Sequence, residues 1–163
     1  VVCSVDADNY TLDESLPAED RPHECFASYV NRLANQQTER AMFVKGRQLL
    51  RGRIGFFRHE FLKVLGGYDE DLIGYGHDDQ DLYRRALGAG FTPHYFGGRF
   101  VSRIKTPRSL KGLNMPEKNW RLTERANQTR SDENLARGRW CANVGREWGK
   151  GRVQKNFREW IDL

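Results

Sequence analysis

Two aspartates near the start of the chain are spaced so that they could share one cation. Asp6 and Asp8 directly follow Val1–Val5, an apolar run that predicts a buried strand of the parallel type. Residues two apart in an extended chain point to the same side, so both carboxylates can chelate one ion. Such oxygen ligands suit Mg²⁺ or Mn²⁺, which would neutralise a departing diphosphate. A polar strand end or loop without a metal would explain the same residues, so the metal site and this alternative both stay open.

A second group of carboxylates follows a glycine-rich stretch, GGYDEDLIGYGHDDQD, at residues 66–81. Its glycines let the backbone approach a ligand, and the ring of Tyr75 can stack on the C–H side of a sugar. Asp78 and Asp79 begin a helix expected over Asp78–Leu87, where the helix dipole keeps a carboxylate ionised, as a general base requires. Ordinary capping of that helix is the alternative explanation.

The elements around these motifs are those of an α/β protein. Strands are expected at 41–44, 53–57, 91–96 and 99–104, and helices at 24–34, 58–65 and 120–135. Gly66 and Gly67 are expected to end the helix at 58–65, and Gly88 the helix that begins at Asp78. Residues 11–22 are expected to form a loop, and residues 139–163 show no assignable pattern.

Composition favours one globular domain. The 163 residues are 38% hydrophobic and 30% charged. No apolar run reaches the roughly 18–20 residues of a membrane span. The three widely spaced cysteines indicate reduced thiols and a cytoplasmic location, rather than disulfides or a zinc site. The net charge of +5 is uneven, because 16 of the 27 Lys and Arg but only 7 of the 22 Asp and Glu lie from Arg99 onward.

The two acidic motifs together resemble those of glycosyltransferases of the GT-A fold. Val1–Asn9 looks like that fold's strand and Asp-x-Asp motif, and Gly52–Leu82 looks like the acceptor-side segment of β1,4-galactosyltransferases and many bacterial family-2 enzymes. The resemblance implies a mixed sheet flanked by helices, with residues 1–163 a single domain fragment that lacks the N-terminal nucleotide-binding half. It also implies metal-dependent, inverting transfer from a nucleotide-diphospho-sugar to a hydroxyl acceptor such as a saccharide.

On the donor side, the resemblance assigns Asp6 and Asp8 to the metal and the diphosphate, with Asp8 as the direct ligand. These families commonly take a third ligand, often His, from the loop after the strand that here ends near Ile104, where this sequence has Lys105. Either another group such as His94 is the ligand, or Lys105 and neighbouring arginines contact the diphosphate directly.

On the acceptor side, the resemblance gives Asp79 the position of the catalytic base and Asp78 that of its acidic neighbour. Tyr75 stands where such enzymes often have a Trp that packs on the acceptor. Gly76, beside it, and Gly55, in the preceding glycine-containing strand, complete the expected acceptor-binding residues. We therefore expect Asp79 to remove the proton from the acceptor hydroxyl.

Two other classes of function compete with this hypothesis. Phosphohydrolases of the haloacid dehalogenase type also begin with an apolar strand and Asp-x-Asp, but Tyr10 occupies the place of their Thr or Val. A non-catalytic module could use the basic last third on nucleic acid, although no recognition-helix or stacking motif supports this, and we expect no nucleic-acid partner.

The basic last third of the chain has two interpretations as part of a transferase. It is either an amphipathic helix and a C-terminal strand that cover the sheet with solvated charges, or it includes a lid. In the second case Arg103, Lys105 and Arg108 form a mobile basic loop that closes over the donor diphosphate and excludes water.

Overall fold

The sheet at the centre of the fold has four strands, in the order β1-β4-β3-β5. The computed structural model describes residues 2–3, 9–11, 32, 35, 40–45, 54–96, 101–103, 119–150, 152–155 and 159–162. The four strands are β1 (Val2–Cys3), β3 (Ala41–Lys45), β4 (Ile54–Phe56) and β5 (Thr92–Phe96). Because β3 runs parallel to β5 and antiparallel to β4, the sheet is mixed, as the sequence predicted.

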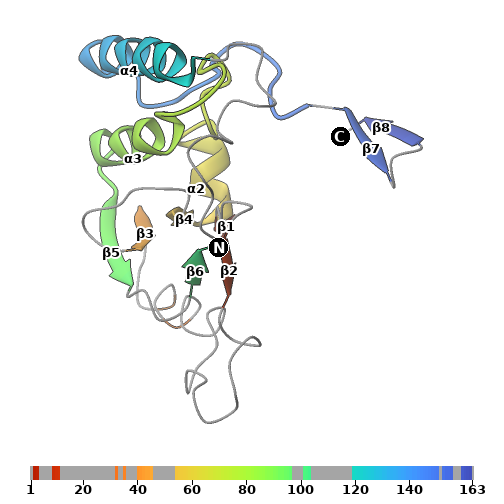
Figure 1. Ribbon diagram of the computed structural model, residues 1–163. Coiled ribbons are helices and arrows are strands. Elements are labelled where there is room, and N and C mark those ends of the chain that lie inside the picture. The colour runs from red at the N-terminus through yellow and green to blue at the C-terminus, as the bar shows by residue number, and fades with distance from the viewer. Residues whose placement is uncertain are drawn as a thin grey trace.

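Two further pairs of strands lie outside this sheet. β2 (Asn9–Thr11) pairs with β6 (Val101–Arg103), and β7 (Arg152–Lys155) pairs with β8 (Glu159–Asp162). The β7–β8 hairpin lies away from the central sheet in Figure 1, so within the described residues no C-terminal strand covers the sheet as one interpretation expected. Most of the helix expected at 24–34 and most of the loop expected at 11–22 lie outside the described residues.

The first strand differs in direction from the prediction. β1 pairs antiparallel with β4, so the expectation of a parallel-type strand was wrong. A short apolar run is compatible with burial in either direction, and its composition does not distinguish the two. The pairing places Cys3 opposite Gly55, which has Phe43 on its other side, so Gly55 lies in the middle of the sheet.

Three helices lie above the sheet in two layers. α2 (Arg58–Lys63) and α3 (Asp78–Gly88) lie next to the sheet, and α4 (Trp120–Ala136) packs on α3 (Figure 1). The buried core between the strands and the first helical layer consists of Met42, Val44, Ile54, Phe56, Leu65, Leu82, Ala86, Ala89 and Phe91. The predicted α/β class is therefore confirmed.

Glycines mark the ends of both α2 and α3. Beyond α2, Gly66 and Gly67 have φ of 64° and 70°, as predicted, and the Gly67 amide donates to the Phe61 carbonyl at 2.9 Å. α3 ends at Gly88, within one residue of the predicted end at Leu87, although the left-handed residue beyond it is Gly90, with φ 84°. Gly88 lies within α3, where a Cβ atom would come within 2.3 Å of the Trp140 ring.

A buried ion pair connects α3 to its surroundings. Arg85 Nε lies 2.7 Å from Asp81 Oδ2, and the two side chains are 1% and 0% exposed. The remaining guanidinium nitrogens of Arg85 donate to the carbonyls of Leu65 at 2.7 Å and Gly67 at 2.9 Å. The Ser131 hydroxyl donates to Asp81 Oδ1 at 2.8 Å. One pair thus ties α3 both to the glycine turn after α2 and to α4.

The buried side of α4 is polar. The helix was expected to be amphipathic, yet its two buried side chains are Asn127 and Ser131, while Leu122 is 52% exposed. The helix therefore packs on α3 through hydrogen bonds where an apolar stripe was expected.

Removal of the charge that compensates Arg85 should destabilise the fold strongly. We expect Asp81→Asn to lower the free energy of unfolding by about 3 kcal/mol, because it leaves a buried guanidinium without its anion. Arg84→Ala, one residue away, breaks an exposed pair with Asp132 and should cost less than about 1 kcal/mol. Urea unfolding of the two variants measures both values, and equal losses would contradict the central role of the buried pair.

The glycine turn after α2 should tolerate no side chain. A Cβ atom at Gly66 would lie 2.2 Å from the Ala142 carbonyl oxygen, in addition to the cost of a positive φ. We expect Gly66→Ala to destabilise the protein by more than about 3 kcal/mol. Gly138→Ala is the matched control, since φ there is 68° and no atom lies within 4 Å, so it should cost only about 1–2 kcal/mol. Thermal unfolding distinguishes the two, and similar losses would mean that strain alone matters.

Candidate functional site

The loop between α2 and α3 and the first turn of α3 hold most of the predicted acceptor-side residues. Tyr75 and Gly76 lie in this loop, and Asp78 and Asp79 are the first two residues of α3. The structure therefore brings these four together on one segment. Gly55 lies apart from this loop segment, buried in strand β4.

The predicted base, Asp79, is half-buried and held by a tyrosine. The Tyr68 hydroxyl donates to Asp79 Oδ1 at 3.1 Å. The Tyr68 ring packs edge-on against Phe61 of α2, with ring centroids 6.1 Å apart. Asp78, by contrast, is exposed. Core packing of Tyr68 thereby limits where the Asp79 carboxylate can lie.

The residue before α3 adopts an unusual backbone conformation. His77 has φ 73° and ψ −9°, in the left-handed region that a non-glycine residue rarely adopts. Its ring is 9% exposed, and Nε2 has no hydrogen-bond partner among the described residues. Burial lowers the pKa of His77 below its usual value, and the charge of Arg84 lowers it further. The ring is therefore neutral near pH 7.

Helix α4 holds the loop that carries Tyr75 through its backbone. The Tyr75 amide donates to Thr123 Oγ1 at 3.2 Å, and that hydroxyl donates to the Tyr75 carbonyl at 3.1 Å. One turn further along α4, the Asn127 side-chain amide donates to the carbonyls of Gly76 at 2.8 Å and Ile73 at 3.2 Å. These contacts satisfy loop carbonyls that secondary structure does not use.

The glycines of this loop permit its close approach to α4. A Cβ atom at Gly74 would lie 2.9 Å from Thr123 Cγ2, and one at Gly76 would lie 3.1 Å from Glu124 Cγ. Between these glycines the Tyr75 ring makes an edge-on contact with Trp120, with centroids 5.5 Å apart. The ring predicted to stack on an acceptor thus already has one aromatic neighbour.

The first part of the loop is held by the segment after α4. The Asn143 side-chain amide donates to the carbonyls of Gly66 at 2.8 Å and Tyr68 at 2.7 Å. The buried Asp69 carboxylate accepts hydrogen bonds from the Asp71 amide at 3.0 Å and the Asn134 side chain at 3.3 Å. Sequence reasoning missed these supports, because Asn143 contacts residues that lie more than 70 positions earlier in the chain.

One signal in the sequence could have revealed the helix side of this support. Thr123, Asn127 and Ser131 are spaced four residues apart, so they share one face of α4. A row of short hydrogen-bonding side chains within an otherwise charged helix indicates a polar interface, just as an apolar stripe indicates a hydrophobic one.

Most of the predicted donor-side residues lie outside the described part of the chain. These are Asp6, Asp8, Lys105 and Arg108. The β2–β6 ladder, however, places Asn9, which directly follows Asp8, opposite Arg103. The two chain segments that carry the predicted diphosphate contacts therefore run next to each other at this ladder.

A metal site is not found within the described residues. They contain no group of three or more His, Cys, Asp or Glu side chains arranged to hold a metal ion. His94, the alternative third ligand, is half-buried in β5 and lies 6.0 Å from the Phe43 ring, centroid to centroid. The Asp6 and Asp8 metal site stays a prediction.

Comparison with known proteins gives one finding. Residues 38–118 match the family model described as the N-terminal domain of galactosyltransferase. This range contains β3, β4, α2, α3, β5 and β6, and with them the loop that carries Tyr75 and the helix that carries Asp79. Neither the curated proteins nor the solved structures gave a significant match. Among the described residues no helix has the length and apolar character needed to cross a membrane. The match supports a glycosyltransferase-family domain in this chain.

Proposed function

We propose that this chain carries the metal-binding and acceptor-binding residues of a metal-dependent, inverting glycosyltransferase of the GT-A fold, active in the cytoplasm. Its donor is a nucleotide-diphospho-sugar, and its acceptor is a saccharide or another hydroxyl compound. The observation that carries the proposal is the position of Asp79. This carboxylate lies in the first turn of α3, half-buried against Tyr68, three residues after Gly76 and within the matched range.

The three acidic residues of the first turn of α3 differ in what they can do. Asp81 is fully buried, and its two oxygens bind Arg85 and Ser131, so it cannot reach a substrate. Asp78 is exposed to solvent. Asp79 combines partial burial with a fixed hydrogen bond, which favours it as the proton acceptor.

The proposed reaction is a single displacement. The acceptor hydroxyl attacks the anomeric carbon while its proton passes to the Asp79 carboxylate. The bond between that carbon and the diphosphate breaks, and its electron pair stays on the diphosphate. A Mg²⁺ or Mn²⁺ ion held by Asp6 and Asp8 would neutralise the charge of the leaving group.

The strand register supports the donor side of this proposal. Because Asn9 pairs with Arg103, the basic segment that continues to Lys105 and Arg108 leaves β6 at the end of the ladder where Asp8 joins β2. Cationic side chains at that place would contact the donor diphosphate and form the proposed lid over it.

Replacement of the base should separate catalysis from binding. We expect Asp79→Asn to lower kcat by at least about 100-fold, because the amide cannot accept the proton, while nucleotide binding survives. Turnover of a nucleotide-sugar panel by the full chain measures the first quantity, and calorimetry with the nucleoside diphosphate measures the second. Unchanged turnover in this variant would remove Asp79 from its role.

The role of the Tyr68 hydroxyl in positioning Asp79 can be tested with a second tyrosine, Tyr83, as the matched control. Tyr68→Phe removes the hydroxyl that contacts Asp79 and should lower kcat several-fold, with little change in KM. Tyr83→Phe removes a hydroxyl on α3 that instead lies 3.1 Å from the Tyr95 hydroxyl, and should leave kcat unaltered. Equal effects of the two changes would indicate a general loss of packing.

The cation should be required for donor binding. We expect Asp8→Ala to abolish metal-dependent binding of a nucleoside diphosphate and Asp6→Ala to weaken it, because each removes an oxygen ligand. Titration with Mn²⁺ in the presence and absence of EDTA measures the effect. Full activity in excess chelator, or Mg²⁺-dependent hydrolysis of aryl phosphates in its place, would argue against the proposed transferase.

A further inference from the structure

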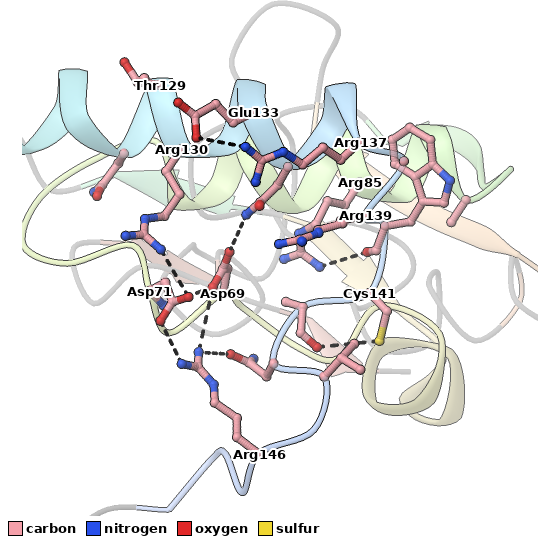
Figure 2. A pocket seen from close by; sticks show the side chains of 18 of the residues that line it. Asp69, Asp71, Arg85, Thr129, Arg130, Glu133, Arg137, Arg139, Cys141 and Arg146 are labelled. Carbon is pink, nitrogen blue, oxygen red and sulfur yellow. Dashed lines mark hydrogen bonds and ion pairs between the residues drawn. The ribbon is translucent and has the colours of Figure 1, made fainter.

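A groove of 1470 Å³ runs beside α4 on the side of the Asp69–Ile73 loop. Its walls come from α4, from this loop and from residues 137–146, as Figure 2 shows. The residues that line it include six arginines, Arg40, Arg85, Arg130, Arg137, Arg139 and Arg146, but only three carboxylates, Asp69, Asp71 and Glu133. The groove is therefore cationic, in a chain whose described part is rich in both signs of charge.

Four of the arginines are available at the surface of this groove. Arg85 is buried and bound to carbonyls, and Arg40 donates to the Ala89 carbonyl, so these two are structural. The other four, which we call the groove arginines, are Arg130, Arg137, Arg139 and Arg146. The side chains of Arg130, Arg137 and Arg146 are at least 39% exposed, and Arg139 is exposed as well.

Two groove arginines already hold a carboxylate between them. Arg130 Nη1 lies 3.2 Å from Asp71 Oδ2, and Arg146 Nη1 lies 2.7 Å from Asp71 Oδ1. The hydrogen bond from Arg146 lowers the pKa of Asp71 below its usual value, and the charge of Arg130 adds to this. The spacing of two guanidinium groups from different segments thus suits a planar anion.

The other two groove arginines carry charge that is weakly compensated. Arg137 approaches Glu133 only to 4.0 Å, at two exposed side chains. Arg139 has no side-chain hydrogen bond or ion pair among the described residues. A ligand with several anionic groups would meet both the Arg130 and Arg146 pair and the weakly compensated charges of Arg137 and Arg139.

One end of the groove lies behind the loop that carries Tyr75. Ile73, Thr123 and Asn127 line the groove, and Thr123 and Asn127 also bind the backbone of Tyr75 and Gly76. An acceptor chain that continues past Tyr75 would therefore reach the groove from this end.

We propose that the groove binds the anionic part of an extended saccharide acceptor, whose carboxylate, sulfate or phosphate groups pair with the groove arginines. This inference rests on the proposed transferase function and specifies its acceptor. The acidic side chains among the arginines disfavour nucleic acid, since a phosphate at every nucleotide would meet Asp69, Asp71 or Glu133. The described lining also offers no free stacking ring, because its one aromatic side chain, Trp140, covers Gly88.

Direct binding measurements test this proposal on the full chain. The probes are fluorescently labelled tetrasaccharides of equal length, one with uronate carboxylates, one sulfated, one phosphorylated and one neutral. We expect at least one anionic probe to bind at least about tenfold more tightly than the neutral one. The double variant Arg137→Ala/Arg139→Ala should lose about tenfold of that affinity, because each exposed pair contributes up to about 1 kcal/mol.

Two single variants sharpen the result. Asp71→Asn removes the carboxylate that pairs with Arg130 and Arg146, although Arg146 keeps its contacts with Asp69 and Asn143, and should raise the affinity for the anionic probe several-fold. Arg125→Ala, on α4 but outside the groove lining, should leave it within twofold. Equal binding of neutral and anionic probes, or tighter binding of a single-stranded oligonucleotide with the same number of charges, would overturn the proposal.

The same experiment distinguishes failure of this inference from failure of the proposed function. Hydrolysis or transfer of the donor sugar by the groove variants is measured in parallel with a neutral acceptor. Normal donor turnover without anion binding would overturn only the proposal that the groove binds an anionic acceptor. Anion binding that depends on the groove arginines, without any donor turnover, would support the groove as an anion site and refute the transferase on which the acceptor assignment rests.

Discussion

The buried pair between Asp81 and Arg85 is the interaction on which the rest of this structure depends. A guanidinium removed from water must have an anion and acceptors for its remaining donors, and Arg85 finds them in Asp81 and in the carbonyls of the glycine turn after α2. The turn in return gains a donor for the Gly67 carbonyl, while the Leu65 carbonyl accepts from both Arg85 and the Ala142 amide. The pair therefore fixes both the rotation of α3 and the start of the loop that leads to the proposed site.

That rotation has a direct consequence for the proposed base. Successive helical residues are about 100° apart, so Asp81 and Asp79 face nearly opposite sides of α3. Because Asp81 must face Arg85 and Ser131, Asp79 is directed to the other side, where the Tyr68 hydroxyl donates to it. A structural carboxylate two positions along thus orients the one proposed for proton transfer.

Local signals in the sequence were sufficient for the elements from β3 to α4, but not for β2, β7 and β8, and not for the contacts between elements. The ends of α2 and the start of α3 followed from glycines and from acidic residues placed against the helix dipole. The direction of β1 did not, because it depends on which strand lies beside it. Likewise, the glycine-flanked Tyr75 and the acidic turn identified the candidate loop, while the partners that hold it, such as Asn127 and Asn143, lie about 50 to 80 residues away in the chain.

Helix α4 connects the candidate loop with the arginine groove. Its Thr123 and Asn127 side chains hold the backbone of the Tyr75 loop by hydrogen bonds, while Arg130, also on α4, and Arg137, just beyond its last residue, line the groove. Polar contacts of this kind are directional, so a small rotation of α4 would lengthen the bonds to Tyr75. A ligand that pairs with Arg130 in the groove would therefore act on the same helix whose hydrogen bonds hold the loop that carries Tyr75.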